Sequence, residues 1–82
     1  MRNEKLVAFG QRVREIRKAK GLTQENMAAL AEIDRSYMGH IERGEKNITL
    51  TKIYQISEAL GIDVTDLFPR STMTNNSAPK KD

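Results

Sequence analysis

The stretch from Arg35 to Arg43 gathers side chains that could bind a charged, hydrogen-bonding partner. If this stretch is helical, its hydrophilic face carries two guanidinium groups, a hydroxyl, a phenol and an imidazole, which belong to Arg35, Arg43, Ser36, Tyr37 and His40. These groups donate hydrogen bonds and supply positive charge, which is the chemistry needed to hold a polyanion. The apolar residues Met38 and Ile41 lie three apart, so they can share a buried face. We therefore interpret the hydrophilic face as the working surface.

The sequence lacks most of the residue types and motifs that catalysis or metal binding would require. It contains no cysteine and one histidine, so thiolate and multi-histidine metal sites lack their ligands. There is neither a glycine-rich phosphate loop nor an evident pair of carboxylates for acid–base chemistry. We expect no enzyme activity, no catalytic residues, no metal and no cofactor.

Charge is spread unevenly along the 82 residues. The formal net charge is +3 and the isoelectric point is about 9.5. Residues 1–20 hold seven Lys and Arg against two Glu, whereas residues 48–69 hold one Lys against three acidic residues. Such polarity suits a polyanion at one end and a different partner, or water, at the other.

Membrane insertion and secretion are not indicated. No apolar run approaches the roughly 20 residues that cross a bilayer. The first residues, Met1 to Lys5, lack the apolar stretch of a secretory signal. We expect a cytoplasmic protein with no membrane partner.

Capping residues and glycines mark the helices that must position the working surface. We expect one helix from after Asn3 to about Lys20, and a second after Thr23. A third helix should run from Arg35 to about Arg43. A fourth should be capped by Thr49 or Thr51 and end near Leu60, and a last short turn should run from Val64 to Phe68. No stretch shows sustained strand alternation. The prediction is a compact all-α domain of five helices.

Apolar spacing predicts the core of this domain. The first helix contributes Leu6, Phe9, Val13 and Ile16, and the fourth contributes Leu50, Ile53, Ile56 and Leu60. Gly10 interrupts the first helix at a cost in helix propensity, which suggests that another helix passes close to it. We expect residues 1–69 to form the domain. Residues 70–82 have too little apolar surface to offset the entropy of ordering, so we expect a disordered polar tail.

The order of motifs resembles the helix-turn-helix domain of the lambda-repressor or xenobiotic-response-element (XRE) family of transcription regulators. The matching residues are Ile16-Arg17, Gly21-Leu22-Thr23-Gln24-Glu25, Ala28, Ile41-Glu42-Arg43-Gly44, Leu60-Gly61-Ile62 and Leu67-Phe68. Within that family, Asp34-Arg35-Ser36-Tyr37 followed by Ile41 to Gly44 and Asn47-Ile48 is similar to the controller proteins of restriction–modification systems.

The resemblance implies a role for each matching position. Gln24 is expected to contact a DNA phosphate, and Arg35, Ser36 and His40 are expected to face base edges in the major groove of double-stranded DNA. Contacts with the DNA backbone are expected from Tyr37, Arg43, Lys46 and Asn47. Arg17 is expected to form a structural ion pair with Glu42.

Simpler roles remain open for three of these residues. Arg17 could instead face DNA, His40 could be a plain surface histidine, and Tyr37 could pack on the domain with its hydroxyl in water. For Arg35 the chemistry is more definite, because its planar guanidinium matches the O6 and N7 acceptors of guanine. We expect Arg35 to read a guanine in each half-site.

The C-terminal end of the domain carries more apolar residues than one short terminal helix would bury in its own protomer. These residues are Ile62, Val64, Leu67 and Phe68, with Tyr54 at their rim. A single recognition helix reads only a few base pairs, so we expect these residues to form a homodimer interface. The alternative is that they close the protomer core, and some of them must do so.

The resemblance thus implies a sequence-specific transcription regulator that acts as a homodimer on a two-fold operator, such as a restriction–modification controller. Bound protein would block RNA polymerase as a repressor, or recruit it if Glu25 or a neighbour touches it. The alternative is an antitoxin-type or other protein-interaction module, although residues 71–82 lack the amphipathic apolar residues expected of a toxin-binding segment.

Overall fold

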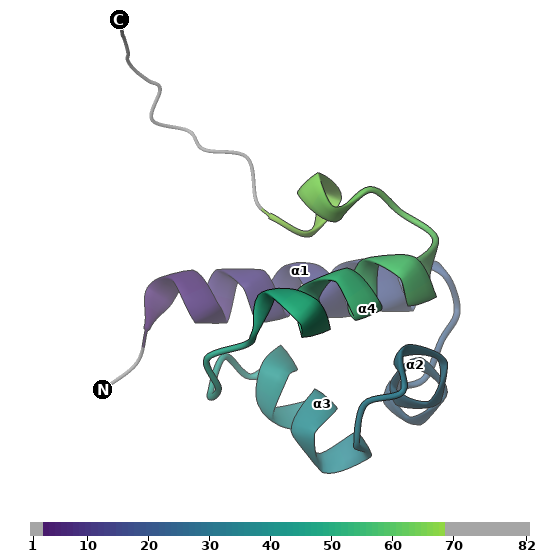
Figure 1. Cartoon of the computed structure of the whole chain (residues 1–82), viewed down its shortest axis with the longest axis horizontal. Helices are drawn as coiled ribbons and strands as arrows, with labels where there is room; N and C mark the ends of the chain where they lie inside the picture. Colours follow the sequence, from purple (N-terminus) through teal and green to yellow (C-terminus); the bar gives the residue numbers. More distant parts are fainter. Residues whose placement is uncertain (1–2, 69–82) are drawn as a thin grey trace, which may run out of the picture.

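The computed structural model describes residues 3–68, and all the regular elements in that range are helical (Figure 1). They are α1 (Glu4–Ala19), α2 (Gln24–Ala31), α3 (Arg35–Glu42), α4 (Leu50–Leu60) and the 3-10 helix η1 (Val64–Leu67). The prediction of an all-α domain is confirmed. The prediction of five helices is wrong in its last member, because residues 3–68 hold four α-helices and a single 3-10 turn. The tail predicted over residues 70–82 lies outside the described residues.

The last turn is 3-10, since its backbone hydrogen bonds join residues three apart. The backbone N–H of Asp66 donates to the carbonyl of Asp63 at 2.9 Å, which is an i to i+3 bond. Phe68 then turns extended, with φ −105° and ψ 133°, as expected for a residue that precedes proline. Arg12 holds the turn against α1, since its Nε donates to the Asp66 carbonyl at 2.8 Å.

Each α-helix begins after a residue whose side chain accepts backbone N–H groups of the first turn. The donor–acceptor distances are 3.0 to 3.3 Å, and the caps are Asn3, Thr23, Asp34 and Thr49. Thr49 rather than Thr51 therefore starts α4. Such caps stabilise a helix by about 1 kcal/mol each, so these four residues largely decide where the short helices begin.

Each of the five elements contributes at least one fully buried side chain to the core, and α3 contributes two: the residues are Val13, Met27, Met38, Ile41, Ile56 and Leu67. Helix α3 packs on α1 and α2, and α2 also packs on α4. Figure 1 places α3 on one side of α1 and α4, and the 3-10 turn on the other. None of the helices within residues 3–68 is long and apolar enough to span a membrane.

Leu50 departs from the predicted core. It is 67% exposed, whereas Ile56 and Leu60 of the same helix are buried and Ile53 is half-buried. Leu50 is the first residue of α4, and the buried residues of this helix lie in its second half. Hydrophobic spacing therefore identified the inward side of α4 but not the point along it where burial begins.

The C-terminal end of α3 is pressed against α1, which fixes the helix that carries the candidate site. A Cβ atom on Gly10 would lie 2.4 Å from the carbonyl oxygen of Ile41, so only glycine fits there. Beyond α3, Gly44 adopts φ +74°, and a Cβ on it would lie 2.6 Å from the Cα of Val7. The close helix contact that Gly10 predicted is therefore made by α3.

Candidate nucleic-acid interface

Helix α3 has one buried and one exposed face. Met38 and Ile41 are buried in the core, at 0% and 2% exposure. Arg35 and Ser36 at its start are exposed. Within residues 3–68 neither side chain makes a hydrogen bond or an ion pair with the protein. The first turn of α3 therefore offers a guanidinium and a hydroxyl whose hydrogen-bonding capacity is available to a partner.

The end of α3 carries a cluster that the sequence did not predict, formed by His40, Arg43 and Glu45. One carboxylate oxygen of Glu45 lies 2.7 Å from His40 Nδ1 and 3.1 Å from Arg43 Nε. Arg43 Nη2 also lies 3.2 Å from His40 Nδ1. If His40 Nδ1 carries a proton, it donates to Glu45 and cannot also accept from Arg43. We assign the proton to Nδ1 because the contact with Glu45 is the shorter of the two.

Electrostatics within this cluster favour the ionised carboxylate. Hydrogen bonds from His40 and then Arg43 lower the pKa of Glu45 below its ordinary value. The backbone brings the carboxylate back over the helix, because the Glu45 N–H donates to the His40 carbonyl at 2.9 Å around Gly44. The spacing His40, Gly44, Glu45 is the signal in the sequence that could have revealed the cluster.

Arg17 and Glu42 form a bidentate ion pair between α1 and the last turn of α3. Arg17 Nε and Nη2 lie 2.7 and 3.1 Å from the two oxygens of Glu42. Both residues are buried, and Arg17 Nη1 donates to the Leu22 carbonyl at 2.8 Å. Because Arg17 faces inward, this pair locks α1, the turn before α2 and α3 together.

Gln24, the first residue of α2, is joined to the same ion pair. Its Nε2 donates to Glu42 Oε1 at 3.1 Å. Its Oε1 lies 3.4 Å from the position that a Cβ would take on Gly39, so the glycine allows Gln24 to lie close to α3. The second amide hydrogen of Gln24 remains available, and the buried pair holds the side chain in a set orientation.

Tyr37 connects α3 to the loop before α4. Its half-buried ring packs against the core, and its hydroxyl donates to the Asn47 carbonyl at 3.4 Å. Lys52 Nζ lies 5.5 Å from the ring centroid, within the range of a cation–π contact. The neighbouring residues Lys46 and Asn47 are exposed. The packing role considered for Tyr37 is thus present, with its hydroxyl on a carbonyl rather than in water.

The residues predicted to pair two copies differ in burial. Leu67 is fully buried in its own protomer, and Ile62 and Val64 are half-buried against the core. Tyr54 and Phe68 are each 47% exposed. Leu67 therefore closes the protomer core and has no surface to offer a second copy.

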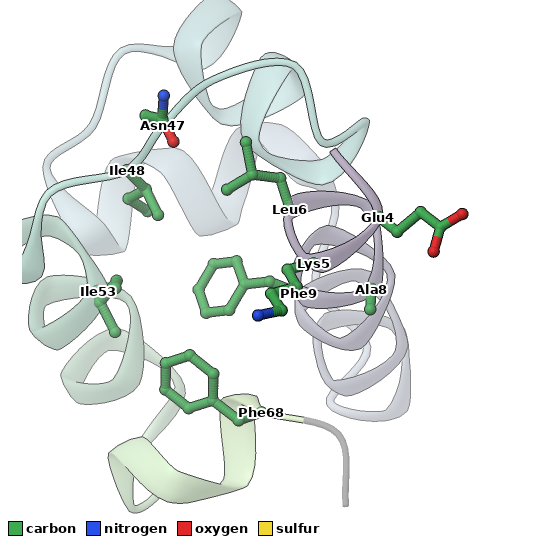
Figure 2. A pocket seen from close by; sticks show the side chains of 9 residues that line it. All are labelled: Glu4, Lys5, Leu6, Ala8, Phe9, Asn47, Ile48, Ile53 and Phe68. Atoms are coloured by element: carbon green, nitrogen blue, oxygen red, sulfur yellow. The ribbon is translucent and has the colours of Figure 1, made fainter. Parts of the chain in front are cut away.

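A hollow of about 480 Å³ adjoins Phe68 (Figure 2). Its apolar wall comes from α1, the loop before α4, α4 and the residue after η1, and consists of Leu6, Phe9, Ile48, Ile53 and Phe68. The rings of Phe9 and Phe68 have centroids 5.4 Å apart and a tilt of 46°. Glu4, Lys5, Ala8 and Asn47 complete the lining. This hollow extends the exposed apolar surface at the C-terminal end of the domain.

Within residues 3–68, no group of three or more His, Cys, Asp or Glu side chains is placed to hold a metal ion. The site consists of an exposed polar face on α3, and buried contacts with α1 and α2 fix the position of this helix. Such a face can bind a partner through hydrogen bonds and charge.

Comparisons with known proteins identify similar chains. A family model described as helix-turn-helix matches residues 13–67. Control protein C.BamHI from Bacillus amyloliquefaciens is 41% identical over 76 residues, which cover 92% of this chain and 94% of that protein. Control protein C.MunI from Mycoplasma sp is 39% identical over 67 residues, which cover 80% and 90%. The crystal structure of the restriction–modification controller protein C.AhdI from Aeromonas hydrophila superposes with a TM-score of 0.79 at 50% identity, covering 80% of this chain and all of that chain.

Proposed function

Because this chain belongs to the helix-turn-helix family of DNA-binding transcription regulators, we propose that it acts as a homodimer on a two-fold operator and controls a restriction–modification system. The family resemblance seen in the sequence is confirmed. The controller role is supported by the two control proteins and by the controller structure that share this fold. Dimer formation and the layout of the operator are the parts of the proposal that require a test.

The observation that carries the proposal is the exposed and unpaired start of α3. An α-helix fits the major groove, and its N-terminal residues approach the base edges. Arg35 stands at that end with a guanidinium that matches guanine, and Ser36 beside it can donate or accept. We assign Arg35 and Ser36 to base reading, and His40 to the same groove-facing side one turn along.

Phosphate contacts would surround this face. Gln24 begins α2, where free backbone N–H groups also favour an anion, and Glu42 holds its side chain in place. Arg43, Lys46 and Asn47 lie at and beyond the end of α3, where they can reach the DNA backbone. Tyr37 can join them only if its hydroxyl proton leaves the Asn47 carbonyl. These contacts supply affinity that depends on salt but not on sequence.

A second copy would cover the apolar surface at the C-terminal end. Tyr54 and Phe68 are its most exposed members, with Ile62 and Val64 at its edge. The 3-10 turn η1, beside which this surface is built, lies on the other side of α1 and α4 from α3 (Figure 1), so pairing around η1 would leave α3 of each copy free. The two helices could then enter successive major grooves roughly 34 Å apart. Glu25 is exposed on α2 and would be open to RNA polymerase at a promoter.

Selection of bound sequences from random duplexes tests the proposal directly. The expected result is an inverted repeat with a guanine in each half-site and half-site centres about one helical turn apart. Sedimentation should show a dimer at the concentrations that bind DNA. A protein that ignores every duplex at low salt, or that binds its site as a monomer, would overturn the proposal.

A further inference from the structure

The cluster at the end of α3 contains a carboxylate on a surface that should attract a polyanion. We propose that Glu45 is a specificity-determining residue, which acts by holding His40 and Arg43 away from non-specific phosphate contacts until the correct site draws His40 to a base edge and releases Arg43 to its own phosphate. This inference rests on the proposed function, because it presumes that α3 reads DNA. It adds a residue that acts through two side chains already placed at that surface.

The first step of the argument is geometric. The Gly44 N–H donates to the Ile41 carbonyl at 3.0 Å, the Glu45 N–H donates to the His40 carbonyl at 2.9 Å, and Gly44 has φ +74°. This pattern of bonds around a left-handed glycine holds the following residue over the last helical turn. The backbone of Glu45 is therefore held beside His40 and Arg43, within reach of its half-exposed side chain.

The second step concerns charge. One oxygen of Glu45 accepts from both His40 Nδ1 and Arg43 Nε, at 2.7 and 3.1 Å. Charge-assisted bonds of this kind are among the stronger polar contacts of a protein surface. A phosphate that approaches Arg43 must replace the carboxylate or tolerate its negative charge. In contrast, Arg35 and Lys46 have no such partner within residues 3–68.

The third step separates wrong DNA from right DNA. Non-specific binding consists almost entirely of phosphate contacts by Lys and Arg, so pairing Arg43 with Glu45 removes part of that binding. At the correct site α3 is docked fully in the groove. There the base edges offer acceptors to His40 and amino groups that donate to the Glu45 carboxylate, which releases Arg43 to its own phosphate. Glu45 thus penalises wrong DNA more than right DNA, which is how a repulsive group creates specificity.

The test is the variant Glu45→Gln with Glu58→Gln as a matched control. Glu58 is exposed on α4 and makes no ion pair within residues 3–68, and both substitutions remove one negative charge. Affinity is measured for the selected operator duplex and for an unrelated duplex of equal length, each at several salt concentrations. Thermal unfolding checks that both variants fold like the wild type.

For Glu45→Gln, binding to the unrelated duplex should tighten by about threefold to tenfold. Its log–log dependence on salt should be steeper by about 1, because the Arg43 guanidinium becomes free to bind a phosphate. Affinity for the operator should change less, so the ratio of the two affinities falls. Glu58→Gln should leave that ratio unchanged.

Two results would overturn the inference while the proposed function stands. In one, Glu45→Gln shifts both duplexes by the same factor as Glu58→Gln, which would be an effect of net charge alone. In the other, operator binding weakens and unrelated binding does not tighten, which would make Glu45 a direct base reader. Failure of the wild type to prefer any duplex would overturn the proposed function itself.

Discussion

Gly10 of α1 and Ile41 of α3 meet backbone to backbone, since a Cβ on Gly10 would lie 2.4 Å from the Ile41 carbonyl oxygen. A carbonyl inside a helix cannot swing away as a side-chain end can. The orientation of α3 therefore depends on the absence of a methyl group at Gly10 of α1.

Gly10→Ala should reduce the free energy of unfolding by about 1–3 kcal/mol, because overpacking forces a backbone shift that outweighs the gain in helix propensity. Chemical denaturation measures the change. Gly39→Ala is the matched control, because its Cβ would meet only the side-chain ends of Arg43 at 3.2 Å and Gln24 at 3.4 Å. If both variants are equally stable, the contact with Ile41 is not as rigid as the geometry indicates.

Arg17→Ala should cost about 3–5 kcal/mol, because it leaves the Glu42 carboxylate buried without its cation. The two side chains are 10% and 3% exposed, so water can do little to replace the pair. Urea unfolding of Arg17→Ala, Glu42→Gln and the double variant would measure the interaction free energy between the two side chains. The double variant should be less destabilised than the sum of the single ones. Strict additivity would mean that the two residues do not act as a pair.

Local signals along the chain predicted the helix starts and stops well. A cap such as Thr23 and a stop such as Gly61 act within four residues of sequence, so no knowledge of the fold is needed to recognise them. The exposed face of α3 was also predictable, because Met38 and Ile41 identify the side that turns inward.

The features that sequence reasoning missed depend on neighbours from elsewhere in the fold or around a turn. Leu50 has the right spacing for the core, but burial of α4 begins further along the helix. Leu67 looked available for pairing, yet its own protomer buries it completely. Glu45 looked like part of a plain polar loop until the left-handed Gly44 returned its carboxylate to α3.

Arg35→Ala should weaken operator binding by about 1–3 kcal/mol for each guanine that the guanidinium no longer reads, and the guanine preference should disappear from the selected sequences. Stability should not change, since Arg35 is exposed and makes no ion pair within residues 3–68. Lys46→Ala is the comparison, because removing a phosphate-binding cation weakens binding to all sequences alike and lowers the salt slope by about 1. An unaltered consensus for Arg35→Ala would remove Arg35 from the base readers.

Stability should fall in acid partly through Asp63. Hydrogen bonds from the Thr65 hydroxyl and backbone N–H lower the pKa of Asp63 below its ordinary value of 3.8. A carboxyl whose pKa is lower in the folded state stabilises the fold above the unfolded pKa, and that contribution is lost as the pH falls through the folded pKa. In Asp63→Asn, whose amide oxygen can still cap η1, the melting temperature should depend less on pH below about 4.

Tyr54→Glu should weaken self-association without unfolding the protomer. The Tyr54 side chain is 47% exposed on α4, so a charged replacement is tolerated in the monomer but would be buried without a partner at the proposed interface. Leu30→Glu is the matched control, because Leu30 is 56% exposed on α2, a helix that contributes no residue to the proposed interface. Sedimentation should show Tyr54→Glu dissociating at concentrations where the wild type and Leu30→Glu remain paired. Its operator affinity should fall in parallel, because one recognition helix then binds alone. If Leu30→Glu dissociates and Tyr54→Glu does not, the copies meet through α2 instead of the C-terminal surface.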